Sequence, residues 1–279
     1  MYKILEKTQF SEKVFKFRIE APQMAKHAHA GQFLMVRANE TGERVPFTFA
    51  DWNPEEGWVE FIFMVVGKTT KMLSTYEAGD SLEDVTGPLG QPSEFGDGKW
   101  GVIGGGVGLA IAFPIARKLV KEGKDVHAIM GARTKELLLL EDQFRSILPD
   151  DHIHITTDDG SYGEKGVVTA PEERLLEAGQ IDHIFCVGPV PMMKFATLTA
   201  VKHDCPITAS LNPIMVDGTG MCGCCRVEVG GETKFACVDG PDFDANLVDW
   251  DDLAHRQASY KAEEAESIKR HEEDCACQK

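Results

Sequence analysis

The sequence predicts an antiparallel β-barrel followed by a parallel α/β domain with a cysteine-rich loop near its end. Three observations predict this fold class: strand-like alternation before residue 98, strand and helix patterns in turn from Trp100, and the run DGTGMCGCCRVEV beginning at Asp217. We expect a barrel over residues 1–98, an α/β domain over 99–210, a cysteine loop over 211–245 and a charged C-terminal helix over 246–279.

Length, charge and cysteine content limit the class of protein. A chain of 279 residues is long enough for about two domains with cores of their own. The net charge of -16 argues against a nucleic-acid partner, because phosphate binding needs a basic face. No apolar run approaches the ~18 to 20 residues of a membrane span, and the first residues, MYKILEKTQF, lack the pattern of a signal peptide. We therefore expect a cytoplasmic protein with reduced cysteines and no membrane partner.

The predicted barrel rests on short segments with a period of two. In VFKFRIE the apolar residues Phe15, Phe17 and Ile19 alternate with charged ones, and GWVEFIFMVV shows the same alternation. GQFLMVRAN and RVPFTFADW supply two more strands, and the Pro- and Gly-rich segment TGPLGQPSEFGDGK ends the domain. Short strands separated by such turns are typical of a small antiparallel barrel.

The predicted α/β domain begins with WGVIGGGVGLAIAFPIARKLVKEG, a buried strand, a glycine turn and an amphipathic helix. The turn GGGVGLA would direct helix N-terminal amides at a pyrophosphate, but Leu109 stands where a full GxGxxG motif has its third glycine, so an ordinary tight turn also fits. Two more glycine turns, TTDDGSYG with Asp158 and CVGPVPMM, follow later strands. We expect all three at the carboxyl edge of one sheet, where open α/β sheets bind ligands.

Ordinary structural roles also explain two further features, the segment VVGKTT and four histidines. The segment VVGKTT imitates the end of a P-loop, but Ile62 occupies the position of the required earlier glycine, which excludes a nucleotide triphosphatase. Its glycine and hydroxyls are expected to contact a cofactor phosphate or to form an ordinary polar turn. The histidines in or beside predicted strands are expected to be structural; they are His127, His152, His154 and His183.

The cysteine loop allows three interpretations. A disulfide is disfavoured in a reducing compartment. Zinc could use Cys222 and Cys225 as one half-site, but only Cys237 is placed to complete the other half. The spacing Asp217-x4-Cys222-x2-Cys225 followed by Cys237 fits a plant-type [2Fe–2S] site with aspartate in the first position, and this interpretation leads.

The loop's other residues refine the iron–sulfur interpretation. Gly218, Gly220 and Gly223 suit a loop that wraps a cluster, because such a loop needs positive φ or close backbone approach at several positions. Cys224 could replace Asp217 as the fourth ligand or be a spare thiol beside it.

The ordered motif series makes a family resemblance specific. RVPFT, VVGKTTKML, GPLG, GGGVGLA, GARTKELLLLED, TTDDGSYGEKG, VGPVPMM and the cysteine loop resemble the ferredoxin reductase superfamily over nearly all the chain except its last thirty residues. Within it the chain most resembles the small subunits of NADH-dependent reduced ferredoxin:NADP+ oxidoreductases. The electron-transfer subunits of dihydroorotate dehydrogenase B and of sulfide dehydrogenase are similar, but the dihydroorotate branch normally supplies four cysteines.

The resemblance implies which residues hold the cofactors. For FAD they are Arg44, Pro46, Phe47, Thr48, Ile62, Phe63, Met64, Gly67, Thr69 and Thr70. For the nicotinamide dinucleotide they are Gly105, Gly106, Gly108, Arg133, Asp158, Gly188, Pro189 and Met192. One departure is that Val45 fills the arginine position of the flavin motif, with Arg44 one residue earlier. For the cluster we expect Asp217, Cys222, Cys225 and Cys237, with Cys224 unbound.

The resemblance also implies the activity and the partner. NAD(P)H would give a hydride to FAD, and single electrons would pass through the [2Fe–2S] centre to a larger flavin and iron–sulfur subunit that performs electron bifurcation. Because the cofactors carry this chemistry, we expect no catalytic base or nucleophile. A zinc-stabilised binding module is the alternative from a different class. Arg133 at a strand end could meet the 2'-phosphate of NADPH, but the resemblance favours NADH, with Arg133 as a pyrophosphate or surface contact.

Overall fold

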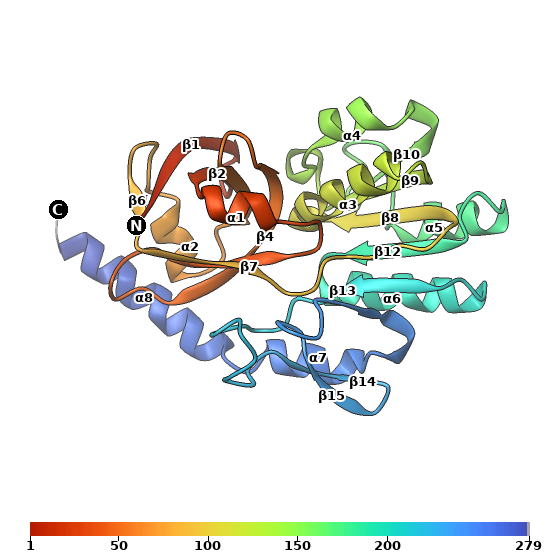
Figure 1. The fold of residues 1–279 in the computed structure, drawn as a ribbon. Helices are drawn as coiled ribbons and strands as arrows, with labels where there is room; N and C mark the ends of the chain where they lie inside the picture. Colours follow the sequence, from red (N-terminus) through yellow and green to blue (C-terminus); the bar gives the residue numbers. More distant parts are fainter. Residues whose placement is uncertain (278–279) are drawn as a thin grey trace.

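The computed structural model describes the backbone of residues 1–277 and the side chains of residues 1–273. Two seven-stranded sheets form its two halves, with a small hairpin and two helices following the second sheet (Figure 1). No helix within residues 1–277 is long and apolar enough to cross a lipid bilayer.

The first sheet is the predicted antiparallel barrel. Its strand order is β6-β1-β2-β5-β4-β3-β7, and every neighbouring pair is antiparallel. The alternation read from the sequence is confirmed, because Phe17 and Ile19 are fully buried inside it together with Phe61. Its elements are β1 (Tyr2–Ser11), β2 (Val14–Glu20), α1 (Pro22–His27), β3 (Phe33–Arg37), β4 (Arg44–Asn53), β5 (Trp58–Met64), α2 (Lys68–Leu73), β6 (Ser81–Leu82) and β7 (Asp84–Leu89).

The second sheet is a doubly wound α/β sheet of order β11-β10-β9-β8-β12-β13-β16. All its pairs are parallel except the one between β13 and β16. The strands are β8 (Lys99–Gly105), β9 (Asp125–Ala132), β10 (Ile153–Thr157), β11 (Glu164–Lys165), β12 (His183–Val187), β13 (Ile207–Ser210) and β16 (Asp242–Asp244). The strand order reverses between β8 and β12, which makes the carboxyl ends of these two strands the expected ligand crevice.

Helices cover both faces of this sheet. On one face lie α3 (Leu109–Lys121) and α4 (Glu141–Ile147), and on the other α5 (Thr169–Glu177) and α6 (Val190–Lys202). Short 3-10 turns complete the connections: η1 (Gly106–Gly108), η2 (Lys135–Leu137), η3 (Asp150–His152) and η4 (Ala245–Leu247).

One buried carboxyl group in this domain has no stabilising partner. Glu172 on α5 is fully buried, and neither of its carboxyl oxygens has a hydrogen-bond partner. Burial, with a smaller contribution from the charge of Glu173, raises the pKa of Glu172 to about 9. The group is therefore protonated in the folded protein at neutral pH.

The cysteine loop joins both halves of the molecule. It leads into a hairpin of β14 (Arg226–Val229) and β15 (Glu232–Phe235), after which β16 returns to the edge of the second sheet. The C-terminal segment 246–279 was predicted as one helix, but its described part forms two: α7 (Trp250–Gln257) and α8 (Lys261–Cys277). Only α7 buries large apolar side chains among the described residues of the two, namely Trp250 and Leu253.

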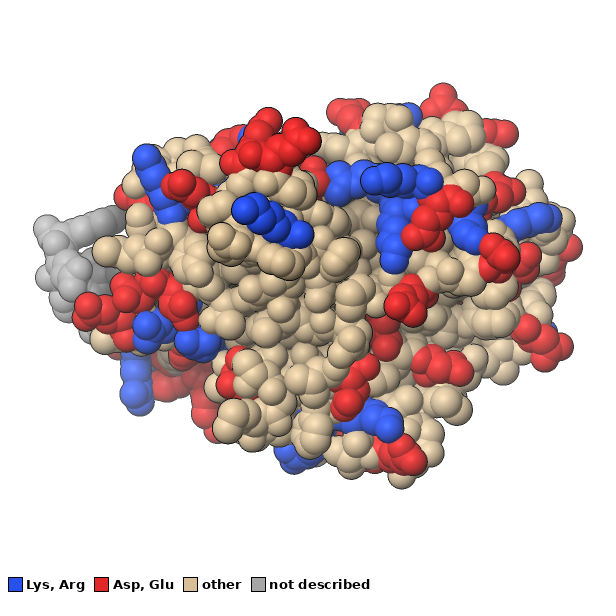
Figure 2. Space-filling view, viewed as in Figure 1, with Lys and Arg blue, Asp and Glu red and all other residues tan. Residues whose placement is uncertain are grey.

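The second of these helices returns to the barrel. Figure 1 shows α8 running from α7 back beneath the barrel, and Lys71 of α2 forms an ion pair with Glu272 at 2.5 Å. On the face drawn in Figure 2, Asp and Glu side chains gather mainly around the margin, while the centre is largely uncharged. The excess of acidic over basic residues is thus not concentrated at the centre of this face.

Candidate functional site

The glycine turns after β8 and β12 touch each other at the reversal point of the second sheet. A Cβ atom on Gly105 would lie 2.3 Å from the sulfur of Met192 and 3.1 Å from Cδ of Pro189. A Cβ on Gly108 would lie 2.5 Å from the carbonyl oxygen of the last β12 residue, Val187. Gly105 and Gly108 therefore allow two turns to pack closely, and they bring the predicted nucleotide loops together.

Two of the other nucleotide-loop glycines have backbones that favour glycine. Gly106 has φ of +55° and open space where a side chain would stand, and Gly188 has φ of +156° with its backbone against Gly105. Leu109, which replaces the third motif glycine, is fully buried as the first residue of α3. The close approach that the motif assigns to its third glycine is made here by Gly108.

Two more residues predicted to contact the nicotinamide dinucleotide lie at the same carboxyl edge of the second sheet. Arg133 follows β9 and Asp158 follows β10, and both are exposed. The backbone N–H of Asp158 donates to the carbonyl of Ala132, the residue before Arg133, at 3.1 Å. An acidic residue therefore stands beside the β9 end in space, although none follows that strand directly in the sequence.

The flavin motif on β4 divides between the two faces of the barrel wall. Phe47 stacks on Phe61 at 4.9 Å inside the barrel, and Phe63 is also part of that core. Pro46 and Thr48 alternate with Phe47 and are half-buried on the other face. Their side chains are therefore available to a flavin, whereas Phe47 points into the barrel.

The second flavin strand, β5, shows the same division. Ile62 belongs to the apolar cluster shared with the α/β domain, while its neighbour Phe63 lies in the barrel core. Met64 ends the strand with 38% of its side chain exposed. Sequence reasoning chose consecutive residues here, but the period of two lets only alternate side chains face a ligand.

The two threonine hydroxyls of the turn after β5 have different partners: that of Thr70 bonds within the turn, and that of Thr69 bonds outside it. The hydroxyl of Thr70 accepts hydrogen bonds from the backbone N–H groups of Val66 at 2.9 Å and Gly67 at 3.0 Å. Thr69 donates to the carboxylate of Glu43 at 3.2 Å. Thr70 therefore shapes the turn, and the space beside Gly67 is open.

Arg44 lies on the outer face of β4, between the flavin motif and the cysteine loop. It donates to Asp84 at 2.6 Å and to the hydroxyl of Thr86 at 3.3 Å, both on β7. Hydrogen bonds from Thr219 lower the pKa of Asp217, and the charge of Arg44 lowers it further. Arg44 is thus close enough to Asp217 for their charges to interact.

Two of the predicted cluster ligands meet in the structure. The sulfur atoms of Cys225 and Cys237 are 3.1 Å apart, and both residues are buried. Burial, followed by the contact with Cys225, raises the pKa of Cys237 to about 12. A buried pair of thiols becomes anionic only beside a compensating cation, so this donor pair suits a bound metal centre.

The other candidate ligands lie on the exposed side of the same loop. Cys222 is exposed, Cys224 is half-buried, and the pKa of Cys224 is raised by burial and then by the neighbouring thiols Cys222 and Cys225. One carboxylate oxygen of Asp217 accepts hydrogen bonds from Thr219 and from the backbone N–H of Met221 at 3.2 Å. The other oxygen accepts none from the described residues and is available as a ligand.

The loop glycines have the backbone that the sequence predicted. Gly218, Gly220 and Gly223 have φ of +83°, +85° and +66°. A Cβ on Gly218 would lie 2.7 Å from Cγ of Met35 and 3.0 Å from Leu89, so the loop backbone rests on β3 and β7. Since Met35 pairs with Pro46 across the sheet, the cysteine loop lies against β3, the strand next to β4 of the flavin motif.

Sequence reasoning missed two arginines that hold the cysteine loop. Arg256 of α7 donates to the carbonyl of Cys224 at 3.3 Å, and Arg226 donates to the carbonyl of Gly223 at 3.2 Å. The proximity of Arg226 to the cysteine run was visible in the sequence. Arg256 lies 32 residues from Cys224, and no local pattern connects the two.

Comparison with known families agrees with the three parts of this site. Residues 1–93 match the oxidoreductase FAD-binding domain, and residues 102–197 match the oxidoreductase NAD-binding domain. Residues 212–249 match the iron–sulfur cluster binding domain of dihydroorotate dehydrogenase B. These matches define an oxidoreductase of the ferredoxin reductase type that carries FAD-binding, NAD-binding and iron–sulfur domains, as the sequence predicted.

Individual relatives narrow the class to a family. The dihydroorotate dehydrogenase B electron transfer subunit homolog of Thermotoga maritima is 48% identical over 268 residues, covering 96% of this chain and 94% of that protein. The electron transfer subunit of dihydroorotate dehydrogenase B from Shouchella clausii is 32% identical over 256 residues, covering 88% and 96%. The chain belongs to the family of ferredoxin reductase-type electron-transfer subunits that contains these proteins.

Solved structures also resemble this chain. A chain from the structure of an NADH-dependent reduced ferredoxin-NADP oxidoreductase, determined to study flavin-based electron bifurcation, has a TM-score of 0.89 with 48% identity and 97% of both chains covered. The cytochrome b5 reductase domain of Ulva prolifera nitrate reductase has a TM-score of 0.59 at 21% identity, covering 73% of this chain and 92% of that one. The second similarity concerns the fold alone.

Proposed function

We propose that this chain is the electron-transfer subunit of a larger flavoenzyme, exchanging hydride with NAD(H) and passing single electrons to a partner subunit. The observation that carries the proposal is the packing of the cysteine loop, through Gly218, on β3, the strand that pairs with β4 of the flavin motif. The flavin strands and the metal ligands would then lie side by side, and Ile62 of the flavin strand β5 belongs to the apolar cluster shared with the α/β domain that would hold the nicotinamide. An electron path needs this continuity, whereas a zinc-stabilised binding module does not.

The barrel would hold FAD through the outer face of its wall. Pro46, Thr48 and Ile62 would line the ring with their side chains, while Phe47 and Phe63 would offer only backbone atoms because their rings lie in the core. Arg44 and Met64 would border the same site, and Gly67, Thr69 and Thr70 would form the turn near the diphosphate. When bound, FAD supplies the conversion between two-electron hydride transfer and single-electron transfer.

The α/β domain would position the nicotinamide dinucleotide. Gly106, which has open space beside it, would let the backbone approach the pyrophosphate, and Gly105 and Gly108 would keep the two turns packed together. Gly188, Pro189 and Met192 would close over the nicotinamide. Asp158 beside the β9 end could hold the ribose hydroxyls of NADH, which supports NADH over NADPH. Arg133 would then contact the pyrophosphate or solvent.

The cysteine loop would hold a [2Fe–2S] cluster through Asp217, Cys222, Cys225 and Cys237. The free carboxylate oxygen of Asp217 and the buried pair Cys225 and Cys237 support this set. Cys224 would stay unbound, because Asp217 fills the fourth ligand position, and Arg256 would hold the backbone carbonyl of Cys224. Arginine contacts to the loop backbone would keep it in place and add positive charge near the metal.

A partner subunit would dock over the cysteine loop in the cytoplasm. Met221, which precedes Cys222, exposes 87% of its side chain, and Val216 exposes 54%. Exposed apolar side chains that flank a redox centre favour a protein interface there. We propose a larger flavin and iron–sulfur subunit that reduces NADP+ by electron bifurcation. Subunits that oxidise dihydroorotate or reduce sulfur compounds are the alternatives within the family.

Co-expression with candidate partners tests the proposal. The chain alone should pass electrons from NADH to artificial dyes, and NADP+ reduction should appear only with the larger subunit. Replacing Met221 with Asp should weaken assembly roughly tenfold, and the control Val167→Asp, at an apolar residue that is 57% exposed in the α/β domain, should not. Efficient NADP+ reduction by the isolated chain would contradict the subunit assignment.

A truncation after Tyr260 tests the C-terminal helices separately. It removes α8 and keeps α7, whose Trp250 and Leu253 are buried and whose Arg256 holds the cysteine loop. If the shortened chain still assembles with the large subunit, α8 is not part of the interface. A shortened chain that keeps its cofactors and loses the partner would place α8 in it.

A further inference from the structure

A groove lies between the C-terminal helix α8 and the short helix α2 of the barrel. Figure 1 shows α8 running beneath the barrel beside α2. The groove has a volume of about 610 Å³. Lys68 of α2 lines it on one side, and Glu266, Ser267 and Arg270 are among the α8 residues that line it on the other. The groove is therefore formed by two segments that are about 200 residues apart in the sequence.

Protein contacts alone hold α8 weakly against the barrel. Among residues 261–273, no side chain of α8 is fully buried, and Ile268 is the one large apolar residue that is half-buried. An ion pair between Lys71 of α2 and Glu272, at 2.5 Å, joins the two helices, and both side chains are largely exposed. Exposed ion pairs contribute little to stability, so a ligand in the groove would add contacts that the helix lacks.

The groove adjoins the turn at which the proposed function places the FAD diphosphate. Lys68 directly follows Gly67, and the space where a side chain of Gly67 would stand is open. With the isoalloxazine ring on the barrel wall beside Thr48, the adenosine end of FAD extends from the diphosphate in another direction and needs a site of its own. The groove next to Lys68 is a cavity at this turn that can supply the site.

The side chains of the groove suit an adenosine phosphate. Arg270 donates from Nε to Glu266 at 2.9 Å, and both side chains are more than half exposed. The other N–H groups of a guanidinium suit a phosphate, and its plane can stack on a purine. A carboxylate such as that of Glu266 accepts hydrogen bonds from ribose hydroxyls. The second acidic residue of the groove, Glu263, is balanced by the charge of Lys68, so the groove carries no excess negative charge.

We propose that this groove binds the adenosine monophosphate half of FAD, with α8 as one of its walls. The inference rests on the proposed function, in which the barrel holds FAD. Lys68 would contact the diphosphate, Arg270 would contact the phosphate beside the ribose, and Glu266 would accept hydrogen bonds from the ribose hydroxyls. Bound FAD would in this way tie the C-terminal helix to the barrel.

Flavin titration of the full chain, after its flavin has been removed, tests the proposal, because FMN has the flavin ring and lacks the adenosine half. Arg270→Gln should weaken FAD binding about 10-fold and leave FMN binding unchanged. Lys269→Gln is the matched control, since Lys269 is exposed on the same helix and does not line the groove. This control should bind both flavins as the wild type does.

Removal of α8 provides a second test. The chain truncated after Tyr260 should show the same selective loss of FAD affinity, and backbone hydrogen exchange of residues 261–273 in the full chain should slow with FAD but not with FMN. Unchanged FAD affinity in both Arg270→Gln and the truncated chain would overturn this inference alone, as would an equal loss of affinity for FAD and FMN. A full-length protein that binds neither flavin would overturn the proposed function, and this inference with it.

Discussion

Replacing Glu172 with Gln should stabilise the protein increasingly as the pH rises. The folded state holds this carboxyl group protonated, with a pKa of about 9 against the ordinary value of 4.5. Its contribution to stability is complete below pH 4.5 and is lost as the pH rises toward 9, by about 1.4 kcal/mol per pH unit. At pH 7 the loss is about 3 kcal/mol, which Gln would restore because it resembles the protonated acid.

Denaturant unfolding at pH 5.5, 6.5 and 7.5, followed by the fluorescence of Trp100 and the other tryptophans, measures this difference. The free energy of unfolding of Glu172→Gln minus that of the wild type should rise by about 1.4 kcal/mol per pH unit. Glu173→Gln is the control, since this neighbour on α5 is 46% exposed and should change stability by less than about 0.5 kcal/mol. Parallel pH curves for the wild type and the Glu172 variant would refute the reasoning.

Three further predictions concern the cofactors. Cys224→Ser should keep about two irons per chain and Asp217→Ala should lose them, as measured by iron analysis; the opposite pattern would make Cys224 the ligand. Gly108→Ala should raise the KM for NADH about 10- to 100-fold while FAD stays bound, because its Cβ would lie 2.5 Å from a β12 carbonyl oxygen. The control Gly96→Ala, where a Cβ meets open space, should leave that KM unchanged. Stopped-flow reduction of the FAD should be faster with NADH than with NADPH, and a strong NADPH preference would assign Arg133 to a 2'-phosphate.

Local patterns predicted the fold because each half of the chain has its own period. The alternation around Phe17 placed the barrel strands, and the strand and helix patterns that begin at Trp100 marked the change to the α/β domain. The division of the tail into α7 and α8 was not predicted. Charged helices have little apolar pattern to mark their ends, and Trp250 is buried in a core cluster with residues far from it in the sequence, such as Ile207 of β13.

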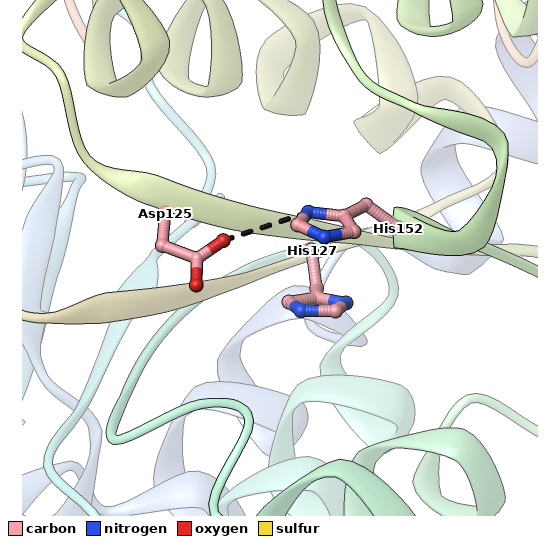
Figure 3. A group of neighbouring side chains, drawn as sticks. All are labelled: Asp125, His127 and His152. Carbon is pink, nitrogen blue, oxygen red and sulfur yellow. Dashed lines mark ion pairs between the residues drawn. The ribbon is translucent and has the colours of Figure 1, made fainter.

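The order of the motifs predicted candidate site residues, but their orientation and their contacts with distant segments became visible only in the structure. Consecutive motif residues such as Phe47 and Thr48 were grouped, although a strand directs them to opposite faces. Arg256 reaches the cysteine loop from α7, and His127 meets His152 through strand pairing (Figure 3). Such contacts between distant segments depend on topology, which residue spacing does not encode.

The central claim is that flavin, nicotinamide and iron–sulfur functions meet in this one chain. Electron paramagnetic resonance of the anaerobically purified protein, before and after NADH is added, tests it most directly, with FAD and metal analysis of the same sample. We predict about one FAD and two irons per chain, and a paramagnetic signal of a reduced [2Fe–2S] centre that appears on adding NADH. Stoichiometric zinc in place of iron, or a protein with iron that gives no signal with NADH, would contradict the claim.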